Sequence, residues 1–153
     1  MYIGIEKLEN SGIQWIGNAD KLSNEAKTLI VVGVARGGTS LVSGALDKLG
    51  VFTGKKSCKP VYEDTLLADA FEKNNLSEAE LIIQTYNNNN KIWSFKRPSS
   101  INYLNKINSL VRNPIYFFIF KDIFSVSNRN SISMKTDVSS GLIKAYKSYG
   151  KIV

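Results

Sequence analysis

The stretch that decides the fold reads Thr28-Leu-Ile-Val-Val-Gly-Val34, then Ala35-Arg-Gly-Gly38, then Thr39-Ser-Leu-Val-Ser-Gly-Ala-Leu-Asp-Lys-Leu49. The first part is a short apolar run rich in β-branched residues, which is typical of a strand buried on both faces of a parallel sheet. The second part interrupts this pattern. The third has apolar residues at helical spacing and is followed by Gly50, the residue type that most often ends a helix. We therefore expect a strand, a glycine-rich loop and a helix in direct succession.

The rest of the chain continues to alternate between strand and helix patterns. Further strands are expected at Lys91-Ile-Trp-Ser-Phe95 and at Ile115-Tyr-Phe-Phe-Ile-Phe120. Further helices are expected at residues 64–72, 77–86, 100–110, 123–134 and 141–149. The second of these helices opens with Ser77 and Glu80, which have the spacing of a capping box. Strands that alternate with helices imply crossover connections, and hence an α/β fold with a mostly parallel sheet.

Length and charge narrow the class of protein. A chain of 153 residues is near the usual size of one domain, which we place at residues 28–153. We expect residues 1–27 to form an N-terminal arm with a short helix near residues 18–26. The formal charge of +7 favours a polyanionic partner, such as a nucleotide, an acidic saccharide, a nucleic acid or an anionic membrane surface. Because the basic residues are scattered, a merely solvated basic surface is the alternative.

The residue types and the apolar runs of the sequence limit the sites that the chain can form and its expected location. There is no histidine, which removes the commonest general base and the commonest metal ligand. A single cysteine, Cys58, excludes an internal disulfide and a zinc site built from cysteines. No apolar run approaches the roughly 20 residues of a membrane span, and the N-terminus lacks a signal-peptide pattern. We therefore expect a cytoplasmic protein without a metal centre or a membrane span.

The segment from Gly33 to Ser40 has the glycine spacing of a Walker A loop, with Thr39 where nucleotide-triphosphate enzymes carry lysine. Glycines allow successive backbone N–H groups to turn inward, and the N-terminus of the following helix adds its positive dipole end, so the segment is suited to hold a phosphate. Arg36 supplies a cation within the loop, and its guanidinium can bind two oxygens at once. The missing lysine argues against hydrolysis of ATP or GTP. A tight turn with a solvated Arg36 is the alternative.

This loop and two later segments together resemble the sulfotransferase family, whose members use 3′-phosphoadenosine 5′-phosphosulfate (PAPS). Val32-Gly-Val-Ala-Arg-Gly-Gly-Thr-Ser-Leu41 resembles the family's 5′-phosphosulfate loop. Trp93-Ser-Phe-Lys-Arg-Pro98 resembles the second-strand segment that brings a lysine near the sulfuryl group in many members. Arg112-Asn-Pro-Ile-Tyr-Phe-Phe-Ile-Phe-Lys-Asp122 and the helix that follows it resemble the 3′-phosphate segment.

The resemblance implies a P-loop-like three-layer fold and a site for PAPS as co-substrate. The residues that it assigns to the co-substrate are Arg36, Gly37, Gly38, Thr39, Ser40, Lys121 and Arg129. The family usually has arginine where Lys121 stands and serine where Arg129 stands, so Arg129 either takes over part of the 3′-phosphate or is an ordinary solvent-facing residue. Family domains continue with further helices beyond this point. We therefore expect a fold that is incomplete at the C-terminus and a chain that transfers sulfate poorly by itself.

The implied reaction is transfer of a sulfuryl group from PAPS to a hydroxyl or amine acceptor, with saccharides and lipids among the acceptor classes. Arg36 and Lys96 are the candidates to neutralise charge on the sulfuryl group. Glu63 or Asp64 is the candidate base, although acids at this place can equally serve as helix N-terminal residues favoured by the macrodipole. Two alternatives are a degenerate P-loop nucleotide kinase and a basic module that binds nucleotides or other polyanions without catalysis. No nucleic-acid partner is expected.

Overall fold

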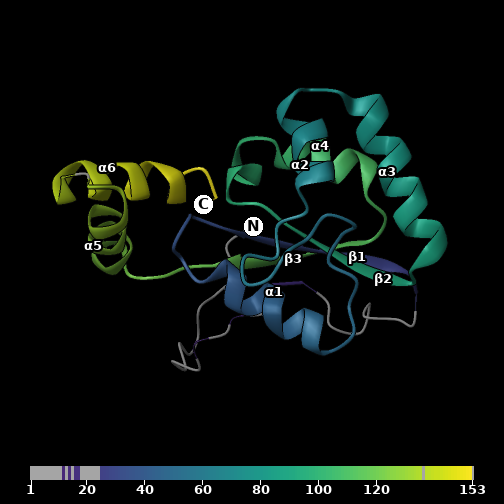
Figure 1. Ribbon diagram of the computed structural model, residues 1–153, viewed down its shortest axis with the longest axis horizontal. Helices are drawn as coiled ribbons and strands as arrows, with labels where there is room; N and C mark the ends of the chain where they lie inside the picture. The colour runs from purple at the N-terminus through teal and green to yellow at the C-terminus, as the bar shows by residue number, and fades with distance from the viewer. Residues whose placement is uncertain (1–11, 13, 15, 18–24, 136, 153) are drawn as a thin grey trace.

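The computed structural model of the chain describes residues 12, 14, 16–17, 25–135 and 137–152. Its centre is a sheet of three parallel strands, β1 (Lys27–Gly33), β2 (Ile92–Lys96) and β3 (Pro114–Ile119), in the order β2-β1-β3 (Figure 1). The register places Gly33 opposite Ile119, so the segments that follow β1 and β3 leave the sheet side by side. The predicted α/β class and parallel sheet are confirmed.

Helices lie on both faces of this sheet (Figure 1). On one face lies α1 (Thr39–Lys48), and on the other lie α2 (Thr65–Glu72), α3 (Leu76–Asn89) and α4 (Leu104–Leu110). A short 3-10 helix, η2 (Pro98–Asn102), follows β2. The last two helices, α5 (Ile123–Met134) and α6 (Val138–Tyr149), form a hairpin to one side of the sheet.

The central strand β1 separates two apolar clusters. Ile30 and Val32 are fully buried against the side chains of α2, α3 and α4. Leu29 and Val31 point to the other face and pack with Leu46 of α1. The strand is thus buried on both faces, which explains why its sequence is an unbroken apolar run instead of an alternating one.

Several helix boundaries differ from the sequence prediction. The helix α3 ends three residues after the expected Tyr86, and α6 begins at Val138, three residues before the expected Gly141. The expected capping box of Ser77 and Glu80 is wrong, because α3 begins at Leu76, one residue before the predicted start. Its N-cap is Asn75, whose side chain accepts the backbone N–H of Glu78 at 3.3 Å and donates to the Glu78 carboxylate at 2.9 Å. The expected helix at residues 100–110 is interrupted at Tyr103, which leaves helical geometry with a φ of −142° while its ring stacks on an aromatic ring of α2.

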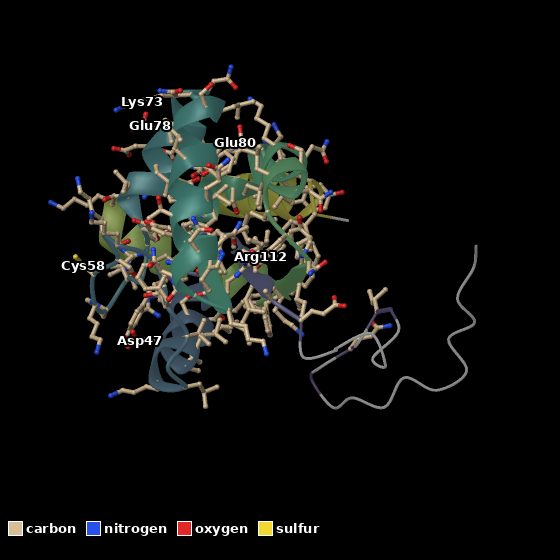
Figure 2. The ribbon with its side chains drawn as sticks, turned by 90° about the vertical axis from the view of Figure 1, so that its right-hand side faces the viewer. Asp47, Cys58, Lys73, Glu78, Glu80 and Arg112 are labelled. Carbon is tan, nitrogen blue, oxygen red and sulfur yellow. The ribbon has the colours of Figure 1, made fainter. Side chains whose placement is uncertain are left out.

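Arg112 binds the short connection between α3 and β2. Its guanidinium donates to the backbone carbonyl groups of Asn87 at 3.0 Å, Asn90 at 2.5 Å and Lys91 at 3.2 Å, beside the C-terminal end of α3 (Figure 2). A cation at the C-terminus of a helix satisfies carbonyl groups that the helix itself leaves free. This arginine of the third quoted segment therefore has a structural role.

Most of the expected N-terminal arm of residues 1–27, including nearly all of the helix predicted near residues 18–26, lies outside the described residues. In the part of the chain that is described, no helix is long and apolar enough to cross a membrane.

Candidate functional site

The loop of residues 33–40, called the glycine loop below, joins β1 to α1 at the carboxyl end of the central strand. Its tight turn is closed by the backbone N–H of Gly37, which donates to the carbonyl oxygen of Val34 at 2.9 Å. Arg36 and Gly38 have φ angles of 65° and 99°, in the left-handed region. A Cβ atom at Gly33 would lie 2.8 Å from the Thr39 side chain, so glycine is required there by contact.

The backbone N–H groups at the N-terminus of α1 have no acceptor among the described residues. The backbone N–H groups of Arg36, Gly38, Thr39 and Ser40 donate to none of the described residues. No side chain in the described part of the chain caps this helix, and its first turn contains no acidic residue. The Arg36 guanidinium is exposed and forms no ion pair within the described chain. Unpaired N–H groups, a positive helix end and a cation together favour an anion.

Lys96, at the end of β2, lies beside this helix terminus. Its side chain is only 3 % exposed, and its ammonium group donates to Ser40 Oγ at 3.1 Å, to the Val61 carbonyl oxygen at 2.9 Å and to Glu63 Oε1 at 2.7 Å. A lysine has three donors, so all three are occupied. The structure therefore brings together Ser40, Glu63 and Lys96, three residues that the sequence analysis assigned to one site.

Glu63 and Lys96 belong to a larger ionic cluster. Arg97 donates to Glu63 at 2.6 Å and binds Glu72 through two nitrogens at 2.9 and 3.2 Å. Hydrogen bonding to Arg97 lowers the pKa of Glu72, and the same bond raises the pKa of Arg97 above its already high value. Two cations face two carboxylates, so the cluster is electrically balanced, in contrast to the glycine loop.

Asp64 is placed differently from its neighbour Glu63. It is 1 % exposed and is the N-cap of α2, where it accepts the backbone N–H groups of Lys56 at 3.1 Å and Leu66 at 3.3 Å. It also accepts the Tyr86 hydroxyl at 2.6 Å, and burial together with this bond raises the pKa of Tyr86. The helix-capping alternative thus describes Asp64, whereas Glu63 is the acid that contacts Lys96.

Lys121 and Arg129, the candidates for the 3′-phosphate, are both exposed. Lys121 follows β3 and Arg129 lies on α5, and neither side chain forms a hydrogen bond or ion pair with a described residue. They are not joined to the ionic cluster. Because β3 is paired with β1, Lys121 emerges from the same edge of the sheet as the glycine loop.

The sequence analysis missed one residue that lies against the loop. Tyr149, at the end of α6, is 9 % exposed and packs with Val34 in a small apolar cluster. Its hydroxyl accepts the backbone N–H of Lys121 at 3.0 Å, and a Cβ atom at Gly37 would lie 3.5 Å from it. No described residue accepts its own proton. No local sequence pattern could have revealed that Tyr149 lies near Gly37, because these two residues are more than a hundred positions apart.

Comparison with known proteins gives no assignment. No family model, no curated protein and no solved structure matches this chain.

Proposed function

We propose that this chain binds PAPS at the glycine loop and transfers its sulfuryl group to a hydroxyl or amine acceptor. The observation that carries the proposal is the open N-terminus of α1. Its first backbone N–H groups have no acceptor among the described residues, Arg36 lies in the loop before it, and Ser40 of its first turn accepts the buried ammonium of Lys96. The loop follows the central strand of a parallel sheet at its carboxyl end, where ligands of open α/β sheets bind. A P-loop-like co-substrate site is consistent with this placement.

The charge distribution supports a phosphosulfate in preference to a nucleotide triphosphate. Thr39 occupies the position from which the lysine of a triphosphate enzyme reaches the outer phosphates. The candidate cations are instead Arg36 within the loop and Lys96 at the end of the neighbouring strand, whose ammonium is paired with Glu63. Arg36 and the backbone N–H groups would hold the 5′ end of the co-substrate, and Lys96 would contact the sulfuryl group being transferred.

The contact between Lys96 and Glu63 suggests how proton transfer and charge stabilisation are coupled. An acceptor O–H or N–H attacks sulfur, the bond between sulfur and the bridging phosphate oxygen breaks, and Glu63 takes the acceptor proton. A protonated Glu63 no longer attracts the ammonium that lies 2.7 Å away. Lys96 is then released to stabilise the negative charge on the departing oxygen, and adenosine 3′,5′-bisphosphate leaves.

The 3′ end of the co-substrate is assigned to Lys121 and Arg129. Neither side chain is paired with a described residue, and the backbone N–H of Lys121 donates to the Tyr149 hydroxyl, which lies close to Gly37. Lys121→Ala and Arg129→Ala should each weaken adenosine 3′,5′-bisphosphate more than adenosine 5′-phosphate, because only the former has a 3′-phosphate.

Calorimetric titration tests the proposal. Adenosine 3′,5′-bisphosphate should bind in the presence of a chelator, and ATP with magnesium should bind more weakly. Binding of ATP that requires magnesium, without binding of the bisphosphate, would favour the kinase alternative. Transfer of radiolabelled sulfate from PAPS to a pool of saccharide, phenol and lipid acceptors then tests catalysis. Transfer by this chain alone is expected to be weak, and Glu63→Gln should abolish it while leaving bisphosphate binding intact.

A further inference from the structure

A shallow hollow lies between α6 and η2, apart from the glycine loop. Its volume is about 420 Å³, and the residues that line it include Ile101 and Asn102 of η2, with Ile143, Lys144, Lys147 and Lys151 from α6 and the turn after it. Lys151 Nζ donates to Asn102 Oδ1 at 2.7 Å, which holds this lysine across the gap between the two segments. The hollow therefore combines a basic wall with two isoleucines.

The positive charge of this region is not neutralised by its own acids. Residues 120–153 contain six lysines or arginines and two acidic residues, a net charge of +4 out of the chain's +7. Both acids are helix caps: Asp122 accepts the N–H of Ser125 at 2.7 Å, and Asp137 accepts the N–H of Ser140 at 3.0 Å. Lys144 forms no ion pair with a described residue, and the same holds for Lys147. An anion from outside the described chain is thus the natural partner.

The spacing of the lysines fits a chain of separated charges. Lys144 and Lys147 lie one turn apart on α6, roughly 4.5 Å along the helix axis, and Lys151 follows in the turn after the helix. Ile143, with 57 % of its surface exposed, adds an apolar contact at the same hollow. Charges at intervals next to an apolar surface match a linear acidic saccharide, whose rings present apolar faces between carboxylate or sulfate groups.

We propose that this hollow binds a linear acidic saccharide as the acceptor of the transfer reaction, an assignment that rests on the proposed function for the acceptor role. Sites for single-stranded nucleic acids stack bases on aromatic side chains, and the residues that line this hollow include none. Tyr146 and Tyr149 line a neighbouring hollow that shares Lys147 and Lys151, so a nucleic-acid probe belongs in the test. Both walls of the hollow are connected along the chain to the site: η2 begins two residues after Lys96, the last residue of β2, and α6 ends at Tyr149, whose hydroxyl lies near Gly37.

The test compares two double variants that each lose two positive charges. Lys144→Gln with Lys147→Gln removes the wall of the hollow. Lys48→Gln with Lys73→Gln removes exposed lysines at the ends of α1 and α2, and Figure 2 shows Lys73 at the outer end of its helix. The probes are a hexasaccharide of alternating glucuronic acid and N-acetylglucosamine, uncharged maltohexaose, a thymidine hexanucleotide and adenosine 3′,5′-bisphosphate, titrated at about 0.15 M salt.

We expect the acidic hexasaccharide to bind and maltohexaose not to bind. The Lys144/Lys147 variant should weaken the acidic hexasaccharide about tenfold, and the Lys48/Lys73 variant less than about twofold, because only the former removes direct charged contacts. Bisphosphate affinity should be the same in all three proteins.

Each of the other possible outcomes would contradict a specific part of the two proposals. Equal losses in both variants would show unspecific attraction and reject the site. Tighter binding of the hexanucleotide through Lys144 and Lys147 would identify a nucleic-acid partner instead. Bisphosphate binding without hexasaccharide binding would reject this inference alone. Hexasaccharide binding through the two lysines without bisphosphate binding would leave a saccharide site but reject its acceptor role and the proposed function.

Discussion

Helices α1 and α2 begin near one another, but their N-termini are satisfied in different ways. At α2 the buried carboxylate of Asp64 accepts two backbone N–H groups and a tyrosine hydroxyl. At α1 the N-cap is Gly38, which has no side chain to offer, and the first N–H groups remain without acceptors in the described chain. Lys96 connects the two places, because it contacts Ser40 of α1 and Glu63, the residue before the α2 cap.

This difference between the two N-termini distinguishes a helix end that contributes to stability from one that can bind a ligand. Every helix N-terminus has free N–H groups and a partial positive charge, which an anion stabilises. Where the chain supplies the anion itself, as at α2, the interaction contributes to folding. Where the chain supplies only glycines and Arg36, as at α1, the same physical preference is available to a ligand. Four predictions test this distinction, beginning with the largest expected effect.

Asp64→Ala should destabilise the fold without a specific effect on ligand binding. The substitution leaves two N–H groups and the Tyr86 hydroxyl without their acceptor in a buried place, which costs about 3 kcal/mol of unfolding free energy. Urea denaturation measures this loss of unfolding free energy. Asp69→Ala, on the exposed face of the same helix, is the control and should change stability by less than about 0.5 kcal/mol. Similar losses in both variants would show that the cap is unimportant.

Arg36→Ala should weaken ligand binding and leave the stability of the fold nearly unchanged, which is the opposite of Asp64→Ala. Because its guanidinium is exposed and unpaired within the described chain, stability should change by less than about 0.5 kcal/mol. Binding of adenosine 3′,5′-bisphosphate should weaken by about 1.5 to 3 kcal/mol, the scale of charge-assisted hydrogen bonds. Calorimetry checks this, with Lys48→Ala at the far end of α1 as the control. An unchanged dissociation constant would mean that Arg36 faces solvent in the complex.

Tyr149→Phe should have a smaller effect, divided between folding and binding. The ring and its packing against Val34 are retained, but the Lys121 N–H loses its acceptor, at a cost of about 1 kcal/mol in unfolding free energy. Bisphosphate affinity should also fall severalfold, because the hydroxyl lies near Gly37 and has a proton free to donate. Tyr146→Phe, with 71 % of the residue exposed, should change neither quantity. If both variants bound the bisphosphate with equal affinity, the Tyr149 hydroxyl would have no role in binding and Tyr149 would contribute only to packing.

Glu72→Gln should give the smallest effect, and one that depends on pH. The folded-state pKa of Glu72 is lowered from 4.5, so its ion pair with Arg97 adds stability above about pH 4.5 and loses it as the pH falls through the lower, folded-state value. The difference in unfolding free energy between the two proteins should be below about 1 kcal/mol at pH 7, because the pair is partly exposed, and should vanish in acid. A difference that grows as the pH is lowered would contradict this assignment.

The sequence predicted the fold best where a local pattern determines the outcome. The apolar run of β1, the interruption at the glycine loop and the helix before Gly50 all follow from periodicity and residue type, and all three are confirmed. The α3 start was misplaced because two caps with similar chemistry compete within a few residues. Asn75 has a favourable N-cap side chain immediately before the helix, which a search for the Ser and Glu spacing overlooks.

The candidate site was only partly accessible from the sequence. Ser40, Glu63 and Lys96 were assigned from separate segments, and their contact depends on strand order, which the sequence pattern alone does not fix. The roles of Glu63 and Asp64 could not be separated, because adjacent acids have the same residue chemistry and differ only in what the fold places around them. Tyr149 could not be found at all, since its position depends on how the last helix folds back.

The α5–α6 hairpin has a further consequence for hydrogen exchange. Its helices approach closely at Gly141, where a Cβ atom would lie 2.4 Å from Ser127 Oγ, so they form a unit largely by packing on each other. A unit of this kind opens with a lower free energy than the central sheet, and its amides should exchange with deuterium well before those of β1. Each opening would also withdraw Tyr149 from Val34 and Gly37. A ligand at the loop that contacts Tyr149 should therefore slow amide exchange along α5 and α6, far beyond the residues that it touches.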